Sequence, residues 1–216
     1  MPEEPATLDP ERWIKLWTRL RAAGEARPVY SQLVRAYAEP ARVYHTAAHI
    51  ADCLRQLDYA AGVAERPEEV EAAIWFHDAV YLPAASDNEE QSALLAQTTL
   101  SSAGVAPETS HRIAAMILAT RHRTLPQSPD AQLLCDIDLA ILGSDPATFE
   151  DYERRIRQEY AWVPEPEYRR ARSEILAGFL RRRTVYQTVP FRERYESTAR
   201  QNLRHSISRL TQASES

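Results

Sequence analysis

The chain has 216 residues, of which 44% are hydrophobic and 26% charged, and its formal net charge at pH 7 is −5. This composition supports one domain with a buried core, and the negative charge argues against a nucleic-acid-binding surface, which needs clustered cations. No stretch reaches the roughly 18 apolar residues of a membrane span, and the acidic start MPEEPATLDP is unlike a secretory signal, so we expect a cytoplasmic protein without a membrane partner.

Helical periodicity follows along the whole chain, and few glycines (5) with many prolines (14) favour helices joined by short, stiff loops. In chain order, the pattern predicts helices over about 10–23, 30–37, 46–62, 67–77, 87–103, 113–120, 134–142, 146–160, 168–179 and 195–210. The start signals include Asp9 before Pro10, and a capping box of Asp87 with Glu90. No segment alternates convincingly at period two, although 185–191 is ambiguous, so the predicted fold class is all-α, a multi-helix bundle.

Several polar residues fall on helix faces that should be buried. His77 continues the apolar stripe of the helix that begins at Pro67, and Asp78 comes directly after it. Asp138 shares a face with apolar residues of its own helix, and His49 lies in the first turn of another. A buried, unpaired carboxylate costs several kcal/mol, so it needs a cation, a cluster of donors or a proton. One divalent cation bound by all four residues would satisfy both carboxylates.

The spacing of these residues indicates a metal site more strongly than any one of them. His49 is followed by the His77-Asp78 pair 28 residues later, and by Asp138 a further 60 residues on. Adjacent helical residues point roughly 100° apart, so both members of the pair reach one ion only where the helix ends or bends. Two nitrogen and two oxygen ligands suit Mn, Fe, Co, Ni or Zn better than Ca.

This ordered set resembles the HD superfamily of metal-dependent phosphohydrolases, which is named for its H…HD…D ligands on a helical bundle. Five segments carry the resemblance to one bacterial branch: RVYHTAAH at 42–49, WFHDAVY at 75–81, DNEEQS at 87–92, DIDLAILG at 136–143 and ARQNL at 199–203. The resemblance implies an HD-type domain over 1–216, with a ligand-bearing core at about 42–143 and C-terminal helices at 145–212 packed on it. It also implies one metal ion and hydrolysis of a phosphate ester, with a nucleotide or another small phosphorylated metabolite as substrate.

One departure from the family pattern concerns the catalytic base. Several HD nucleotidases carry a carboxylate three positions after the HD Asp, where this chain has Tyr81. Glu89 is the nearest substitute, with the alternative that it only favours the dipole of its helix. Asp78 is expected both to bind the metal and to orient water.

Three cationic side chains are candidates for contacting the phosphate. His45 precedes His49 by four residues, with the alternative of a loop histidine bonded to the backbone. His122 follows a helix, where a cation is also favoured by the helix C-terminus. Arg42 would clamp a phosphate, with the alternative of an exposed loop residue.

Two other functions remain open at this point. A di-iron oxygenase of the HD fold would need further histidine ligands, of which His122 is one candidate. A non-catalytic nucleotide sensor would hold the metal structurally. The two cysteines, Cys53 and Cys135, are not in a CxxC pair and are predicted to be buried free thiols. Tyr- and Trp-rich faces leave homo-oligomer formation open.

Overall fold

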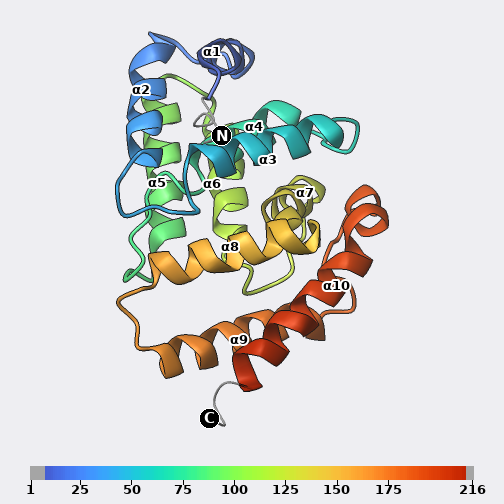
Figure 1. Cartoon of the computed structure of the whole chain (residues 1–216). Coiled ribbons are helices and arrows are strands. Elements are labelled where there is room, and N and C mark those ends of the chain that lie inside the picture. Colours follow the sequence, from blue (N-terminus) through green and yellow to red (C-terminus); the bar gives the residue numbers. More distant parts are fainter. Residues whose placement is uncertain (1–7, 213–216) are drawn as a thin grey trace. The chain divides into compact units, whose positions relative to one another are not determined.

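The structure, a computed structural model, describes residues 8–212. These residues form ten α-helices and one 3₁₀ helix, and none of them lies in a β-strand. In chain order (Figure 1) the helices are α1 (Pro10–Arg19), α2 (Ala26–Tyr37), α3 (Ala47–Tyr59), α4 (Pro67–Phe76), α5 (Asn88–Ser102), α6 (Pro107–Ala119), α7 (Pro129–Asp138), η1 (Leu139–Gly143), α8 (Pro146–Glu159), α9 (Glu165–Arg181) and α10 (Val189–Gln212). The all-α fold class expected from the sequence is confirmed. Within 8–212, no helix combines the length and the apolar character that a bilayer crossing requires.

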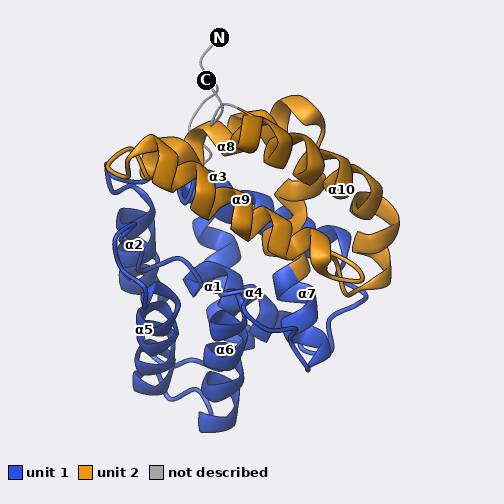
Figure 2. Ribbon diagram, turned by 90° about the horizontal axis from the view of Figure 1, so that it is seen from below, with its two compact units in different colours: residues 1–135 blue, residues 136–216 orange. Residues whose placement is uncertain are grey.

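The chain divides into two compact units, Met1–Cys135 and Asp136–Ser216, which Figure 2 shows in different colours. The boundary falls inside α7, so this helix begins in unit 1 and ends in unit 2. Each unit is described separately below. The single HD-type domain expected from the sequence stays a prediction.

The capping signals in the sequence were right at one of the two starts named above. The Asp9 side chain accepts a hydrogen bond from the backbone N–H two residues further on, at 2.9 Å, and α1 begins at Pro10 as predicted. The capping box of Asp87 with Glu90 was wrong, because Asp87 makes no capping bond. Its carboxylate instead accepts from the amide of Gln91 at 2.9 Å, and Glu90 pairs with Arg121.

Helix α4 lies at the centre of unit 1. All its residues from Glu69 to Phe76 are buried, and it packs against α1, α3, α5 and α6. Two of the buried side chains are glutamates, and each is matched by arginine. Glu71 binds Arg12 at 2.8 Å and also Arg19, both from α1, whereas Glu69 binds Arg112 of α6 at 2.8 Å. The charges therefore tie α4 to one helix that precedes it in the chain and one that follows.

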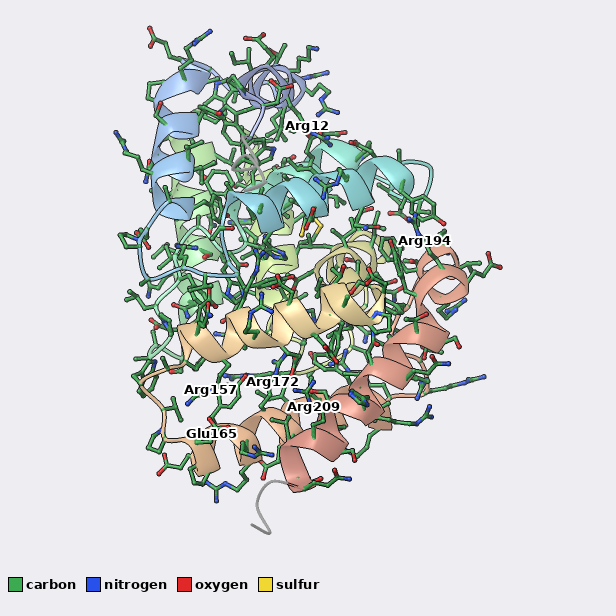
Figure 3. The ribbon with its side chains drawn as sticks, viewed as in Figure 1. Arg12, Arg157, Glu165, Arg172, Arg194 and Arg209 are labelled. Atoms are coloured by element: carbon green, nitrogen blue, oxygen red, sulfur yellow. The ribbon has the colours of Figure 1, made fainter. Side chains whose placement is uncertain are left out.

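In unit 2, α10 packs against α9 and η1, and η1 also packs against α8. Ion pairs join α8 to α9, and Figure 3 labels Arg157, Glu165 and Arg172, which take part in them. Arg157 of α8 donates to Glu165 of α9 at 2.9 Å, while Arg172 of α9 binds Glu153 of α8. Arg172 is buried and also donates to the Tyr152 hydroxyl at 2.9 Å. Charged side chains thus hold these two helices together.

Gly143 ends η1 where α10 comes closest to it. A methyl group at this position would lie 2.5 Å from Tyr195 Cβ, 2.9 Å from the Tyr195 carbonyl oxygen and 3.0 Å from the Tyr186 hydroxyl. The two distances to Tyr195 are shorter than real β-carbons show, and both Tyr195 atoms belong to or adjoin the backbone, while the distance to the Tyr186 hydroxyl is tight. The sequence predicted that Gly143 ends a helix, but it predicted that helix as α throughout, whereas residues 139–143 form a tighter 3₁₀ turn.

We expect Gly143→Ala to lower the free energy of unfolding by about 1–3 kcal/mol, because overpacking forces the α10 backbone to shift. Urea denaturation followed by circular dichroism measures the change. Gly178→Ala is the matched control, since Gly178 lies within α9 and its added methyl would be 3.7 Å from the nearest atom, at the end of the Arg181 side chain. That control should gain about 0.5–1 kcal/mol from helix propensity. Equal effects at both glycines would contradict the packing argument.

Candidate metal centre

Two buried histidines face each other between α3 and α4, which pack together in unit 1. His49 lies in the first turn of α3, and the Thr46 side chain caps this helix by accepting from the Ala48 N–H at 3.3 Å. His77 directly follows the last residue of α4. The Nε2 atoms of the two imidazoles are 3.2 Å apart, and both side chains are almost fully buried. Two nitrogens at this separation are able to bind the same ion.

The Asp78 carboxylate joins the two imidazoles. Its Oδ2 lies 3.2 Å from His77 Nε2 and 3.5 Å from His49 Nε2. Burial by itself raises the pKa of Asp78, but the positive charge of His77, His45 and His49 outweighs it and lowers the pKa below its usual value. The carboxylate is therefore ionised at neutral pH and available as an oxygen ligand.

The end of α4 explains how adjacent residues both reach this point. The last residue of helix α4 is Phe76, and His77 is its C-cap, still with helical backbone angles and with its N–H bonded to the Ala73 carbonyl, so the chain leaves the helix at Asp78. The Ile74 carbonyl lies 2.9 Å from His77 Nδ1, and the Tyr37 hydroxyl donates to the Trp75 carbonyl at 2.9 Å. Because a carbonyl only accepts, His77 Nδ1 carries a proton, so Nε2 is the nitrogen that would offer a lone pair to a metal, on the side of His49 and Asp78, once it loses its own proton.

Arg42 is buried next to this loop, and so the sequence-based alternative of an exposed side chain was wrong. Its guanidinium donates to the Asp78 carbonyl at 2.6 Å, to the Ala79 carbonyl at 3.1 Å and to the His45 carbonyl at 3.2 Å. It also lies over the Tyr81 ring, 5.5 Å from the ring centroid. Arg42 therefore connects the segment before α3 to the segment after α4, and so holds both halves of the site in place.

We expect Arg42→Met to lower the free energy of unfolding by about 3 kcal/mol, because several buried carbonyls lose a charged donor. Thermal or urea unfolding of the purified protein measures this loss. Arg35→Met is the matched control, since Arg35 is exposed on α2, and its substitution should stay within about 0.5 kcal/mol. A loss at position 42 no larger than at position 35 would contradict the bracing role of Arg42.

The predicted phosphate contact His45 lies beside the metal ligands. Its ring centroid is 5.9 Å from that of His49 and 4.1 Å from that of Tyr81, and its side chain is only partly buried. Tyr81 is buried. The structure thus brings His45, His49, His77 and Asp78 together with Tyr81, all within unit 1.

The other predicted site residues occupy different parts of the chain. Glu89 lies in the first turn of α5, with its carboxylate 3.9 Å from Arg121 Nε. His122 follows α6 with a left-handed backbone, at φ 55°, and is partly buried. Asp138 is the last residue of α7 and belongs to unit 2, so its place among the ligands stays a prediction.

Cys53 is a potential ligand that the sequence argument missed. Both cysteines are buried free thiols, as predicted. However, Cys53 lies one helical turn after His49, and ligand atoms of Cys53, His49 and His77 all lie within 4.8 Å of one another. The spacing of four residues on one helix was the available signal, but an apolar helix face makes a cysteine look like a core residue.

The described residues therefore form an all-α fold with a buried group of imidazole and thiol side chains that could hold a metal ion. Comparison of the chain with protein-family models, with curated proteins and with solved structures finds no match.

Proposed function

We propose that this protein is a metal-dependent phosphohydrolase of the HD type, acting on a nucleotide or another small phosphorylated metabolite. The observation that carries the proposal is that two buried imidazoles, His49 and His77, place their Nε2 atoms 3.2 Å apart, with the partly buried Asp78 carboxylate ionised beside them. Buried charges at such distances are typical of metal ligands rather than of a packed core. The H…HD…D order of the sequence supports the same interpretation.

In this proposal His49, His77, Asp78 and Asp138 hold one divalent ion of the Mn, Fe, Co, Ni or Zn group. Bound there, the ion supplies Lewis-acid chemistry to a phosphoryl oxygen and to water. The hydrogen bond between His77 Nδ1 and the Ile74 carbonyl fixes the ring that faces the ion. Asp138 is included among the proposed ligands because of the sequence pattern, and its substitution tests its role as a ligand separately from that of the other three residues.

The remaining residues bind and orient the substrate. His45, partly exposed beside the ligands, donates a hydrogen bond to the phosphate and balances its charge. His122 is proposed as a second donor. Arg42 acts as a positioning residue, because its guanidinium already donates to the carbonyls on either side of the site, and its charge would help to balance that of a bound phosphate. Asp78 or Glu89 orients the attacking water, since Tyr81 has no carboxylate.

The proposal is tested by stripping the metal and adding back Mn²⁺, Co²⁺, Ni²⁺, Fe²⁺ or Zn²⁺ separately. Phosphate release is then measured across a panel of nucleotides and sugar phosphates. We expect turnover with at least one metal, and its loss in Asp78→Asn and Asp138→Asn. Asp52→Asn is the control, because Asp52 is an exposed carboxylate on the same helix as His49.

Three outcomes would count against phosphate hydrolysis. If the folded, metal-loaded protein turns over none of the substrates, the proposal of phosphate hydrolysis is wrong. Tight nucleotide binding without turnover would favour a sensor in its place. Two irons per chain with an optical signature would favour oxygen chemistry.

A further inference from the structure

The Cys53 thiol lies among the proposed metal ligands although the H…HD…D pattern has no cysteine. Cys53 follows His49 by four residues on α3, so both side chains project from the same face of the helix. Its Sγ is 3.7 Å from His49 Nε2 and 3.8 Å from His49 Nδ1, and the residue is 2% exposed. The thiol is thus held against an imidazole that is itself directed at the candidate metal position.

The distances in this group match those between ligands of one ion. With Cys53 as a fifth ligand, bonds of about 2.0–2.1 Å to nitrogen or oxygen and about 2.3 Å to sulfur, at angles of about 90–120°, separate neighbouring donors by about 2.9–3.8 Å. The observed separations are 3.2 Å between the two imidazole nitrogens, 3.5 Å from His49 Nε2 to Asp78 Oδ2 and 3.7 Å from His49 Nε2 to Cys53 Sγ. The sulfur is within this range of Nε2, but it is also 3.8 Å from Nδ1, so it lies beside the ring and reaches an ion bound on Nε2 after rotation of the Cys53 side chain.

We propose that Cys53 is a direct ligand of the metal, and that its sulfur makes the site select Zn²⁺, Co²⁺ or Fe²⁺ over Mn²⁺ and Mg²⁺. This inference rests on the metal site of the proposed function. On binding, the S–H bond breaks, its proton passes to solvent, and the sulfur donates an electron pair to the ion without any change of oxidation state. Thiolate prefers borderline-soft cations, whereas a set of imidazole and carboxylate alone accepts Mn²⁺ as well.

Cobalt titration tests the proposal because a thiolate bound to Co²⁺ gives an intense near-ultraviolet charge-transfer absorption that nitrogen and oxygen ligands do not give. We expect this band in the wild type with one Co²⁺ per chain, and its loss in Cys53→Ser and Cys53→Ala. Cys135→Ser is the matched control, since Cys135 is the other buried thiol and donates to the Ala119 carbonyl on α6. The control should keep the band.

A second measurement compares metals by competition with a chromophoric chelator. In Cys53→Ser the affinity for Zn²⁺ relative to Mn²⁺ should fall by about 10-fold or more. If the wild type binds Co²⁺ without the band, or with a band that Cys53→Ala retains, Cys53 is no ligand and the proposed metal site stands without it. If the folded wild type binds no Co²⁺, both this inference and the metal site of the proposed function fail.

Discussion

His77→Ala is expected to weaken divalent metal binding by more than about 100-fold, since even partners in the outer shell of a metal site are worth about 10–100-fold. His77 contributes the nitrogen that lies 3.2 Å from both His49 Nε2 and Asp78 Oδ2, so its loss removes the atom shared by both close contacts. Alanine also leaves the Ile74 carbonyl without the imidazole partner that fixes the ring. Titration of the metal-free variant with Zn²⁺ against a chromophoric chelator measures the affinity.

The matched control is His111→Ala, because His111 is an exposed histidine on α6. Its substitution should leave the affinity unchanged, which separates the site from adventitious binding by imidazole groups. Far-ultraviolet circular dichroism shows whether each variant is folded. If folded His77→Ala keeps the metal affinity of the wild type, His77 is not a ligand, and the proposed function is contradicted.

The largest expected loss of stability comes from Trp13→Ala, which should lower the free energy of unfolding by about 3–5 kcal/mol. Trp13 is fully buried, and its ring centroid lies 5.2 Å from that of Trp75 and 5.9 Å from that of Phe76, at the end of α4 next to the metal ligands. Its indole N–H donates to the Ala26 carbonyl at 2.9 Å, and this acceptor would lose its donor. Urea unfolding measures the loss.

Trp162→Ala provides the comparison for the same change of side chain at the surface. Trp162 is 62% exposed in the turn between α8 and α9, so its removal leaves no cavity. The expected change is within about 0.5 kcal/mol. Similar losses for the two tryptophans would show that the α1–α4 contact is not the source of the effect.

The fold was largely predictable because helix starts and ends depend on local chemistry. Asp9 caps α1, and Gly104 adopts the left-handed conformation just after α5, at φ 75°. The predicted end of the first helix at residue 23 was wrong, because α1 ends at Arg19 and Arg21 takes a left-handed conformation, at φ 56°. The wrong predictions of helix caps and helix type fall where a side chain has another hydrogen-bond partner, or where a segment packs against residues far away in the sequence. Asp87 accepts from the Gln91 side chain and makes no capping bond to the backbone of its helix, and η1, which was predicted as α-helix, packs against the distant α10.

The site was predictable in part for a related reason. Histidine on a buried face stands out in a sequence, so His49 and His77 were singled out, and the structure places both in a group that could hold a metal ion. The roles of Asp78 and Asp138 as ligands stay predictions. Cys53 did not stand out, because a thiol fits an apolar face without any cost. The role of Arg42 was hidden for another reason, since the carbonyl oxygen of Asp78 that it binds belongs to a residue 36 positions away. Backbone acceptors leave no signal in the sequence.

The ion pairs on α4 affect how this helix unfolds locally within unit 1. Because Glu71 is bound from α1 and Glu69 from α6, α4 is released only when contacts on both sides break together. We therefore expect the backbone amides of residues 70–76 to exchange with deuterium more slowly than those of α2, and at the rate of global unfolding. Deleting residues up to 20 should abolish this protection. The loop that follows α4 and carries the proposed ligands would then be attached to a helix whose buried Glu71 has lost both of its arginine partners.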